Sequence, residues 1–273
     1  MAESPRLPQP TPSSRDIDQS PPTSPLDAIR DRTPARVLVG RAGSGYPTKT
    51  WLALREDHAA ALDAVRGELD MARDLSPALI DQFGLFEVVT QALSKREFLM
   101  RPDLGRRLES SAFTDKDDRC PRGATLQVAI GDGLSAAAVA TQVPPLLPLL
   151  ESGAKARGWS FGRPFVIRHC RVGVLNDIGE RLHPTIALLL IGERPGLTTS
   201  NSLSAYLAYR PHPGQTDADR NLISNIQAHG LSPETAAHQI FALVSAMLQQ
   251  KTSGVPLDLS SPPASEALKI PTE

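Results

Sequence analysis

Charged side chains stand where three predicted strands end. Glu193 and Arg194 follow the continuous apolar run at 186–191, and Asp132 and Arg171 come shortly after two other apolar segments. Because ligands of open α/β sheets bind beyond the carboxyl ends of parallel strands, these residues would line one cleft. Carboxylates accept hydrogen bonds and arginines bind phosphate, so the cleft would suit a large polar ligand. The alternative is that Glu193 and Arg194 pair with neighbours and brace a turn, and the pattern alone leaves both open.

A glycine-rich segment at 40–50 has the outline of a nucleotide-binding P-loop. In a P-loop the lysine directly follows the last glycine, so that it reaches phosphates held by backbone amides. Here three residues separate Gly45 from Lys49, and one of them, Pro47, has no amide proton. The segment is therefore predicted to form a turn at a subunit contact surface, with nucleotide binding as the minor alternative.

No catalytic set can be assembled from the remaining residues. The six histidines show neither the H-E-x-x-H spacing nor a cysteine partnership that would indicate zinc, and there is no G-x-S-x-G nucleophile motif. Cys120 and Cys170 cannot form a disulfide framework, which favours an intracellular location. We predict no catalytic residue and no metal ligand in this chain.

The elements that must position the strand-end charges alternate regularly in the second half of the chain. Such alternation predicts an α/β fold with a Rossmann-like, mainly parallel sheet. Strands are expected at 126–130, 165–168, 186–191 and 203–209, and helices at about 135–157, 174–181 and from Pro233 onward. The first of these helices is expected to be interrupted at Pro144 and Pro145.

Composition shifts divide the chain into four predicted segments. These are a disordered Pro/Ser-rich extension (1–32), a mainly helical subdomain (33–120), the Rossmann-like domain (121–255) and a disordered tail (256–273). The two ends carry many prolines and serines and too few large apolar side chains to offset the entropy of ordering.

Net charge and apolar content exclude some classes of partner. The formal charge of the 273 residues is −1, so no global field attracts nucleic acid or an anionic membrane. No apolar run approaches the ~18–20 residues of a transmembrane helix. We expect neither nucleic acid nor membrane as a partner.

Several ordered motifs between about residues 33 and 255 closely resemble the small subunit of ethanolamine ammonia-lyase. They are Thr-Pro-Ala-Arg at 33–36 with the glycines at 40–45, Arg-Pro-Asp-Leu-Gly-Arg-Arg-Leu at 101–108, Ile-Gly-Glu-Arg-Pro-Gly-Leu at 191–197, and Asp-Arg-Asn-Leu-Ile-Ser-Asn-Ile at 219–226. The resemblance spans all but the two ends of the chain.

The resemblance implies that the chain binds adenosylcobalamin together with a large subunit. The family's cofactor contacts correspond to Val172, Glu193 and Leu222 in this sequence. Some relatives have cysteine where this chain has Leu222, so we expect van der Waals or backbone contacts from Leu222 and Val172. Glu193 would accept hydrogen bonds. The sequence lacks Asp-x-His-x-x-Gly, whose histidine replaces the cofactor's own base, and this agrees with base-on binding in the family.

The implied activity is the radical deamination of ethanolamine to acetaldehyde and ammonia, by a hetero-oligomer whose small subunit is inactive alone. The cobalt cofactor would supply the difficult chemistry. Two alternatives stay open: a non-catalytic α/β assembly partner of a large subunit, and a P-loop-like nucleotide-binding protein. We expect a cytoplasmic location. Some relatives enter a bacterial microcompartment through an N-terminal amphipathic helix, which the proline-rich residues 1–25 do not resemble.

Overall fold

The computed structural model describes residues 25–30, 32–33, 37, 39–113 and 119–259. The chain forms two compact units, Met1–Trp51 and Leu52–Glu273, and helix α2 (Thr48–Arg66) contains the limit between them. Helix α1 (Pro25–Arg30) lies inside the extension that the sequence predicted to be disordered, so part of that extension has regular structure. Residues 1–24 and 31 of the extension lie outside the described residues.

The glycine-rich segment of the first unit forms a tight turn. The amide of Ala42 donates to the Gly45 carbonyl (2.9 Å), and the amide of Gly45 donates to the Ala42 carbonyl (3.2 Å). Gly40 and Gly43 adopt positive φ values of 72° and 64°, where a side chain is disfavoured. The amides of Ala42 and Gly45 are thus already bonded within the turn. The predicted turn is confirmed, and its contact with another subunit stays a prediction.

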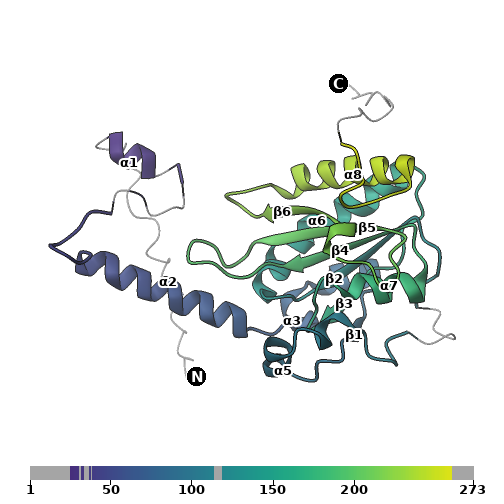
Figure 1. Cartoon of the computed structure of the whole chain (residues 1–273), viewed down its shortest axis with the longest axis horizontal. Coiled ribbons are helices and arrows are strands. Elements are labelled where there is room, and N and C mark those ends of the chain that lie inside the picture. The colour runs from purple at the N-terminus through teal and green to yellow at the C-terminus, as the bar shows by residue number, and fades with distance from the viewer. Residues whose placement is uncertain (1–24, 31, 34–36, 38, 114–118, 260–273) are drawn as a thin grey trace, which may run out of the picture. The chain divides into compact units, whose positions relative to one another are not determined.

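A six-stranded mixed sheet organises the second unit, with strand order β1-β3-β2-β4-β5-β6 (Figure 1). Its strands are β1 (Glu87–Val89), β2 (Leu126–Gly131), β3 (Phe165–Arg168), β4 (Ile186–Gly192), β5 (Leu203–Tyr209) and β6 (Asn221–Ile226). The pairs β1/β3, β3/β2 and β2/β4 are parallel, whereas β5 is antiparallel to both β4 and β6. The predicted α/β class is confirmed. The closer comparison with a Rossmann fold stays a prediction.

Helices cover the two faces of this sheet unequally. On one face, α6 (Ala136–Ala156) and α8 (Pro233–Gln250) pack on apolar side chains from β2, β4, β5 and β6. On the other face, α7 (Val174–Leu182) and the segment 108–113 pack over β2, β3 and β4. Burial of these apolar faces is the main force that holds the layers together.

The expected interruption of the helix at Pro144 and Pro145 is wrong, because α6 continues through them. A proline inside a helix costs roughly 3 kcal/mol, through a lost hydrogen bond and a steric clash. Val143, Leu146 and Leu147 are fully buried on the same helix. Burial of each such side chain contributes about 1.5–3 kcal/mol, so tertiary packing outweighs the local penalty.

The remaining helices are short. They are α3 (Met71–Asp74), α4 (Pro77–Phe83), α5 (Lys95–Met100) and the 3₁₀ turns η1 (Leu104–Arg106) and η2 (Asp217–Asp219). Ser76, Ser94, Ser135 and Ser232 each accept a backbone amide at the start of a helix. After Pro102 the chain forms only the short turn η1. Within the described part of the chain, no helix is long and apolar enough to span a membrane.

The structure continues slightly beyond residue 256, where the sequence predicted the tail to begin. Leu257 is 8% exposed and belongs to the core. Asp258 and Gln250 exchange two hydrogen bonds, of 2.7 and 2.9 Å. Residues 260–273 lie outside the described part.

Candidate functional site

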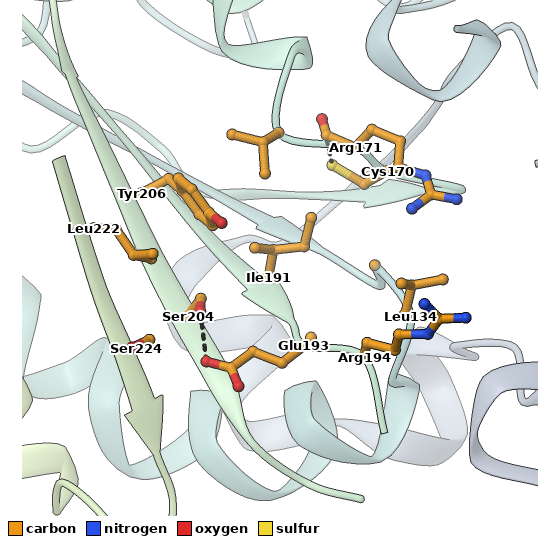
Figure 2. A pocket seen from close by; sticks show the side chains of 13 residues that line it. Leu134, Cys170, Arg171, Ile191, Glu193, Arg194, Ser204, Tyr206, Leu222 and Ser224 are labelled. Carbon is orange, nitrogen blue, oxygen red and sulfur yellow. Dashed lines mark hydrogen bonds between the residues drawn. The ribbon is translucent and has the colours of Figure 1, made fainter. Parts of the chain in front are cut away.

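A pocket of about 330 Å³ lies where the parallel strands β2, β3 and β4 end (Figure 2). We call it the strand-end pocket. Its lining residues are Gly133, Leu134, Cys170, Arg171, Val172, Ile191, Gly192, Glu193, Arg194, Ser204, Tyr206, Leu222 and Ser224. The carboxyl ends of parallel strands meet at one edge of a sheet, which explains why three separate loops converge here.

One side of the pocket is a part of the sheet that α7 does not cover. Side chains alternate between the two faces of a strand, so Ser204 and Tyr206 on β5 and Leu222 and Ser224 on β6 share one face. Tyr206 is half-buried and Leu222 is 48% exposed. An exposed leucine on a sheet face is unremarkable alone, but beside a pocket it indicates a contact surface.

The structure brings together the three residues that the sequence comparison selected. Val172 comes from the loop after β3, Glu193 from the loop after β4, and Leu222 from β6, and all three line the strand-end pocket. Their contact with a cofactor stays a prediction.

Glu193 joins three adjacent parts of the sheet. Its Oε1 accepts a hydrogen bond from the Ser204 hydroxyl (2.6 Å) and another from the Asn225 amide (2.9 Å). Its own amide donates to the Ser202 carbonyl (2.9 Å). Its Oε2 makes no hydrogen bond within the described residues. Glu193 therefore braces the strands through Oε1 and also lines the strand-end pocket.

Two arginines make the other side of the pocket basic. In Figure 2 the guanidinium groups of Arg171 and Arg194 lie on the side away from Tyr206 and Leu222. The Arg171 guanidinium stacks 4.2 Å from the Phe98 ring centroid. Burial lowers the pKa of Arg171, and the positive charge of Arg106 lowers it further. Neither pocket arginine has a carboxylate partner within the described residues, so this side favours carbonyl or anionic groups of a ligand.

Asp132 lies behind the pocket rather than in its lining, so the expectation that it would face the cleft is wrong. It is 1% exposed, and its carboxylate accepts the backbone amides of His169 (2.9 Å) and Cys170 (2.8 Å). Burial raises the pKa of Asp132, while the positive charge of Lys95 acts in the opposite direction. Burial and the neighbouring Asp132 also raise the pKa of Cys170 well above its usual value. The Asp132 carboxylate bonds backbone amides, and Nδ1 of His169 lies 2.9 Å from the Ala92 carbonyl oxygen, so these side chains are not hydrogen-bonded to one another as in a catalytic triad.

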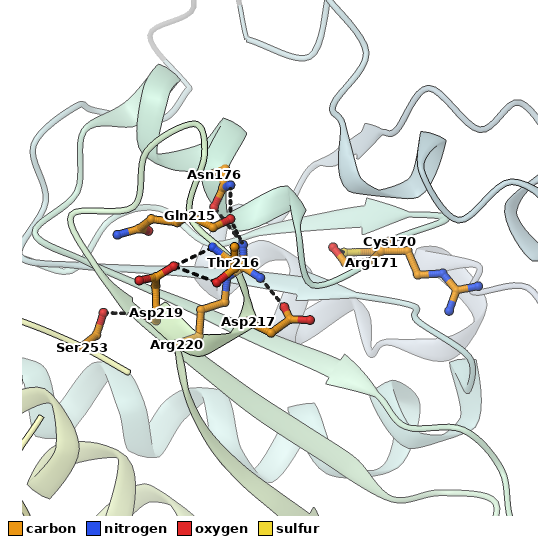
Figure 3. A network of polar contacts seen from close by, with 9 residues as sticks. All are labelled: Cys170, Arg171, Asn176, Gln215, Thr216, Asp217, Asp219, Arg220 and Ser253. Carbon is orange, nitrogen blue, oxygen red and sulfur yellow. Dashed lines mark hydrogen bonds and ion pairs between the residues drawn. The ribbon is translucent and has the colours of Figure 1, made fainter. Parts of the chain in front are cut away.

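A buried arginine anchors the chain just before β6 (Figure 3). Arg220 forms an ion pair with Asp217 and donates to the Asn176 side-chain oxygen on α7 (2.8 Å). Asn176 in turn donates to the Gln215 carbonyl (2.9 Å). The side chain of Arg220 is 3% exposed, so it acts inside the fold and fixes the strand that carries Leu222.

Sequence reasoning missed Lys95, Ser204 and Tyr206. Ser204 and Tyr206 alternate with apolar neighbours on β5, and this two-residue period signals a strand face that is only partly covered. Lys95 gave no signal, because a lysine in the first turn of a short helix is usually solvated. Its burial depends on packing beneath the β2 loop, where Nζ donates to the Gly133 carbonyl (3.3 Å). The described residues contain no group of three or more His, Cys, Asp or Glu side chains that could hold a metal ion.

Comparison with known proteins gives a consistent result over most of the chain. Residues 23–258 match the family model of the ethanolamine ammonia-lyase light chain (EutC). The ethanolamine ammonia-lyase small subunit of Clostridium perfringens is 39% identical over 229 residues, covering 84% of this chain and 76% of that protein. The small subunit of Clostridium acetobutylicum is 35% identical over 232 residues, covering 85% and 93%. That of Listeria monocytogenes serotype 4a is 38% identical over 229 residues, covering 84% and 76%.

Proposed function

The chain belongs to the ethanolamine ammonia-lyase light-chain family, and from this premise we propose that it forms one side of an adenosylcobalamin site shared with a large subunit. Together the two subunits would convert ethanolamine to acetaldehyde and ammonia, and this chain would be inactive alone. A cytoplasmic hetero-oligomer is the corresponding assembly.

The observation that carries the proposal is the convergence of Val172, Glu193 and Leu222 on the strand-end pocket. The pocket is too small to enclose a whole corrinoid, since pockets of ~300–1,000 Å³ enclose only drug-sized ligands. It opens onto the uncovered face of β5 and β6. A ligand lying there would remain exposed on its far side, so a second chain is needed to complete the site.

The lining of the pocket fits a corrinoid chemically. A corrin is a flat, largely apolar ring whose edge carries amide side chains. Tyr206, Leu222 and Val172 provide apolar surface, and Oε2 of Glu193 provides an acceptor for an amide N–H. Arg171 can donate to amide carbonyls or to a phosphate.

When bound, the cofactor supplies the radical chemistry through its cobalt–carbon bond, and the protein supplies orientation and exclusion of water. The part of this chain is to hold one edge of the ligand against a rigid sheet. Glu193 is fixed by Ser204 and Asn225, so its free oxygen has a defined position before the ligand arrives. Such preorganisation lowers the entropy that binding must offset.

The direct test is co-expression with the neighbouring large subunit and an assay of acetaldehyde formation with and without adenosylcobalamin. The proposal expects cofactor-dependent product from the pair and none from either chain alone. Assembly without cobalamin binding would instead indicate a non-catalytic assembly partner.

A further inference from the structure

Asp132 is a buried carboxylate that holds the loop after β3. Among the described residues it makes no hydrogen bond to a side chain that lines the strand-end pocket. Its Oδ2 accepts the amide of His169 (2.9 Å), and its Oδ1 accepts the amide of Cys170 (2.8 Å). These are the first two amides after β3. Arg171 and Val172, which follow at once, line the pocket.

The loop adopts a conformation that needs such support. His169 has a φ of +56°, in the left-handed region that residues other than glycine seldom adopt. Thr90 donates its hydroxyl to the His169 carbonyl (3.0 Å), and the amide of Arg171 donates to the Gly105 carbonyl (2.8 Å). The amides of residues 169–171 and the His169 carbonyl therefore all have hydrogen-bond partners. Asp132 is the partner of two of these amides, those of His169 and Cys170.

Lys95 holds the neighbouring loop, which follows β2. It is 7% exposed, lies 5.1 Å from the Phe98 ring centroid, and donates to the Gly133 carbonyl (3.3 Å). Gly133 itself has a φ of +56° and lines the pocket. Lys95 and Asp132 thus each hold one of two adjacent loops through hydrogen bonds, Lys95 the loop after β2 and Asp132 the loop after β3.

We infer that Asp132, supported by Lys95, is a positioning residue that sets the geometry of Arg171 and Val172 for the corrinoid. This inference rests on the proposed cobalamin role of the pocket. Asp132 does not contact the ligand, and its effect passes through the backbone at 169–172.

The test compares Asp132→Asn with the matched control Asp177→Asn in the assembled complex. Asp177 is 4% exposed, and each of its oxygens also accepts one N–H, from Arg107 (3.1 Å) and from the Leu108 amide (2.8 Å). It does not line the pocket. In either variant the amide oxygen can accept only one of the two N–H groups, so each variant loses one hydrogen bond, and Asp177→Asn also loses the ion pair with Arg107.

Two measurements separate a positioning role from a general loss of stability. Titration with adenosylcobalamin, followed by visible absorption, should show about tenfold weaker binding in Asp132→Asn and a change within about twofold in Asp177→Asn. Hydrogen exchange of the cofactor-free complex should show lost protection at residues 169–171 in Asp132→Asn only. Equal affinities in the two variants would overturn the inference.

If the complex with Asp132→Asn does not assemble, a second variant that keeps the carboxylate tests the positioning role. Thr90→Val removes the hydroxyl that bonds the His169 carbonyl and leaves the carboxylate intact. It should weaken cobalamin binding about threefold, and unchanged binding together with unchanged exchange at 169–171 would refute the positioning role. If the unmutated complex does not bind cobalamin in the same titration, the proposed function fails first.

Discussion

Glu193→Gln should weaken cobalamin binding while leaving the fold nearly as stable as before. The glutamine oxygen can still accept from Ser204 and Asn225, which both bond Oε1 in the parent. The amide NH₂ then replaces Oε2, so the pocket loses its free acceptor and gains a donor. The substitution therefore separates the brace across the strands from the contact with the ligand.

The expected magnitudes follow from these bonds. A hydrogen bond to a charged group contributes about 1.5–3 kcal/mol, and a neutral one about 0.5–1.5 kcal/mol. Making the brace neutral should then cost about 1 kcal/mol, or roughly 2–4 °C in Tm for a domain of this size. Loss of the ligand bond should raise the Kd for adenosylcobalamin about 10- to 100-fold.

Ser204→Ala is the matched control, because it removes one bond of the brace and leaves both carboxylate oxygens. It should lower the Tm of the complex by a similar amount and change the Kd by less than about threefold. Both quantities are measured on the assembled complex, by thermal unfolding and by absorbance titration. Unchanged affinity in Glu193→Gln would show that Glu193 only braces the sheet. Equal weakening in both variants would show that it acts through position alone.

Three further predictions concern the fold around the site. Because burial raises the pKa of Cys170, iodoacetamide at pH 8 should leave it unmodified in the native chain, as judged by peptide mass spectrometry, and labelling before unfolding would contradict this. Gly192→Ala should cost about 1–3 kcal/mol in urea unfolding, since its Cβ would lie 2.1 Å from the Ser135 carbonyl oxygen, whereas Gly196→Ala should be nearly neutral. Hydrogen bonds lower the pKa of Asp219 in the folded chain. The difference in unfolding free energy between the parent and Asp219→Asn should therefore be largest at neutral pH and shrink as the pH falls below 3.8. A difference that does not change with pH would contradict this.

The sequence could predict the parallel strands β2, β3 and β4 and the sheet edge where the strand-end pocket lies, but not the short parallel strand β1. A run such as 186–191, apolar at every position, is typical of a strand buried on both faces, and Glu193 stands out because it ends that run. Strand β6 escaped detection because only Ile223 and Ile226 are buried in it. An edge strand with one open face has no continuous apolar signal.

What the sequence could not supply depends on contacts between distant segments. The sequence places Asp132 at the end of a strand. Only the structure shows that its carboxylate accepts hydrogen bonds from backbone amides 37 and 38 positions away. The sequence around Lys95 predicts a solvated lysine, whereas in the structure the loop after β2 packs on it and accepts its hydrogen bond. Pro144 reads as a helix breaker because the local penalty is visible, while the buried neighbours that outweigh it are not.

The position of the pocket follows from the change in strand direction after β4. Parallel neighbours need crossover connections, and here α6 and α7 make them on opposite faces of the sheet. Strand β5 instead returns antiparallel to β4, and β6 returns antiparallel to β5, so neither connection contains a long helix that could cover the α7 face. Helix α8 then covers only the opposite face. The boundary between the part of this face that α7 covers and the part over β5 and β6 that it leaves open lies beside the carboxyl ends of β2, β3 and β4. There the hydrogen-bonded loops after these strands meet an open sheet surface. A large flat ligand needs both, and in the proposed function the strand-end pocket would therefore hold one side of the corrinoid.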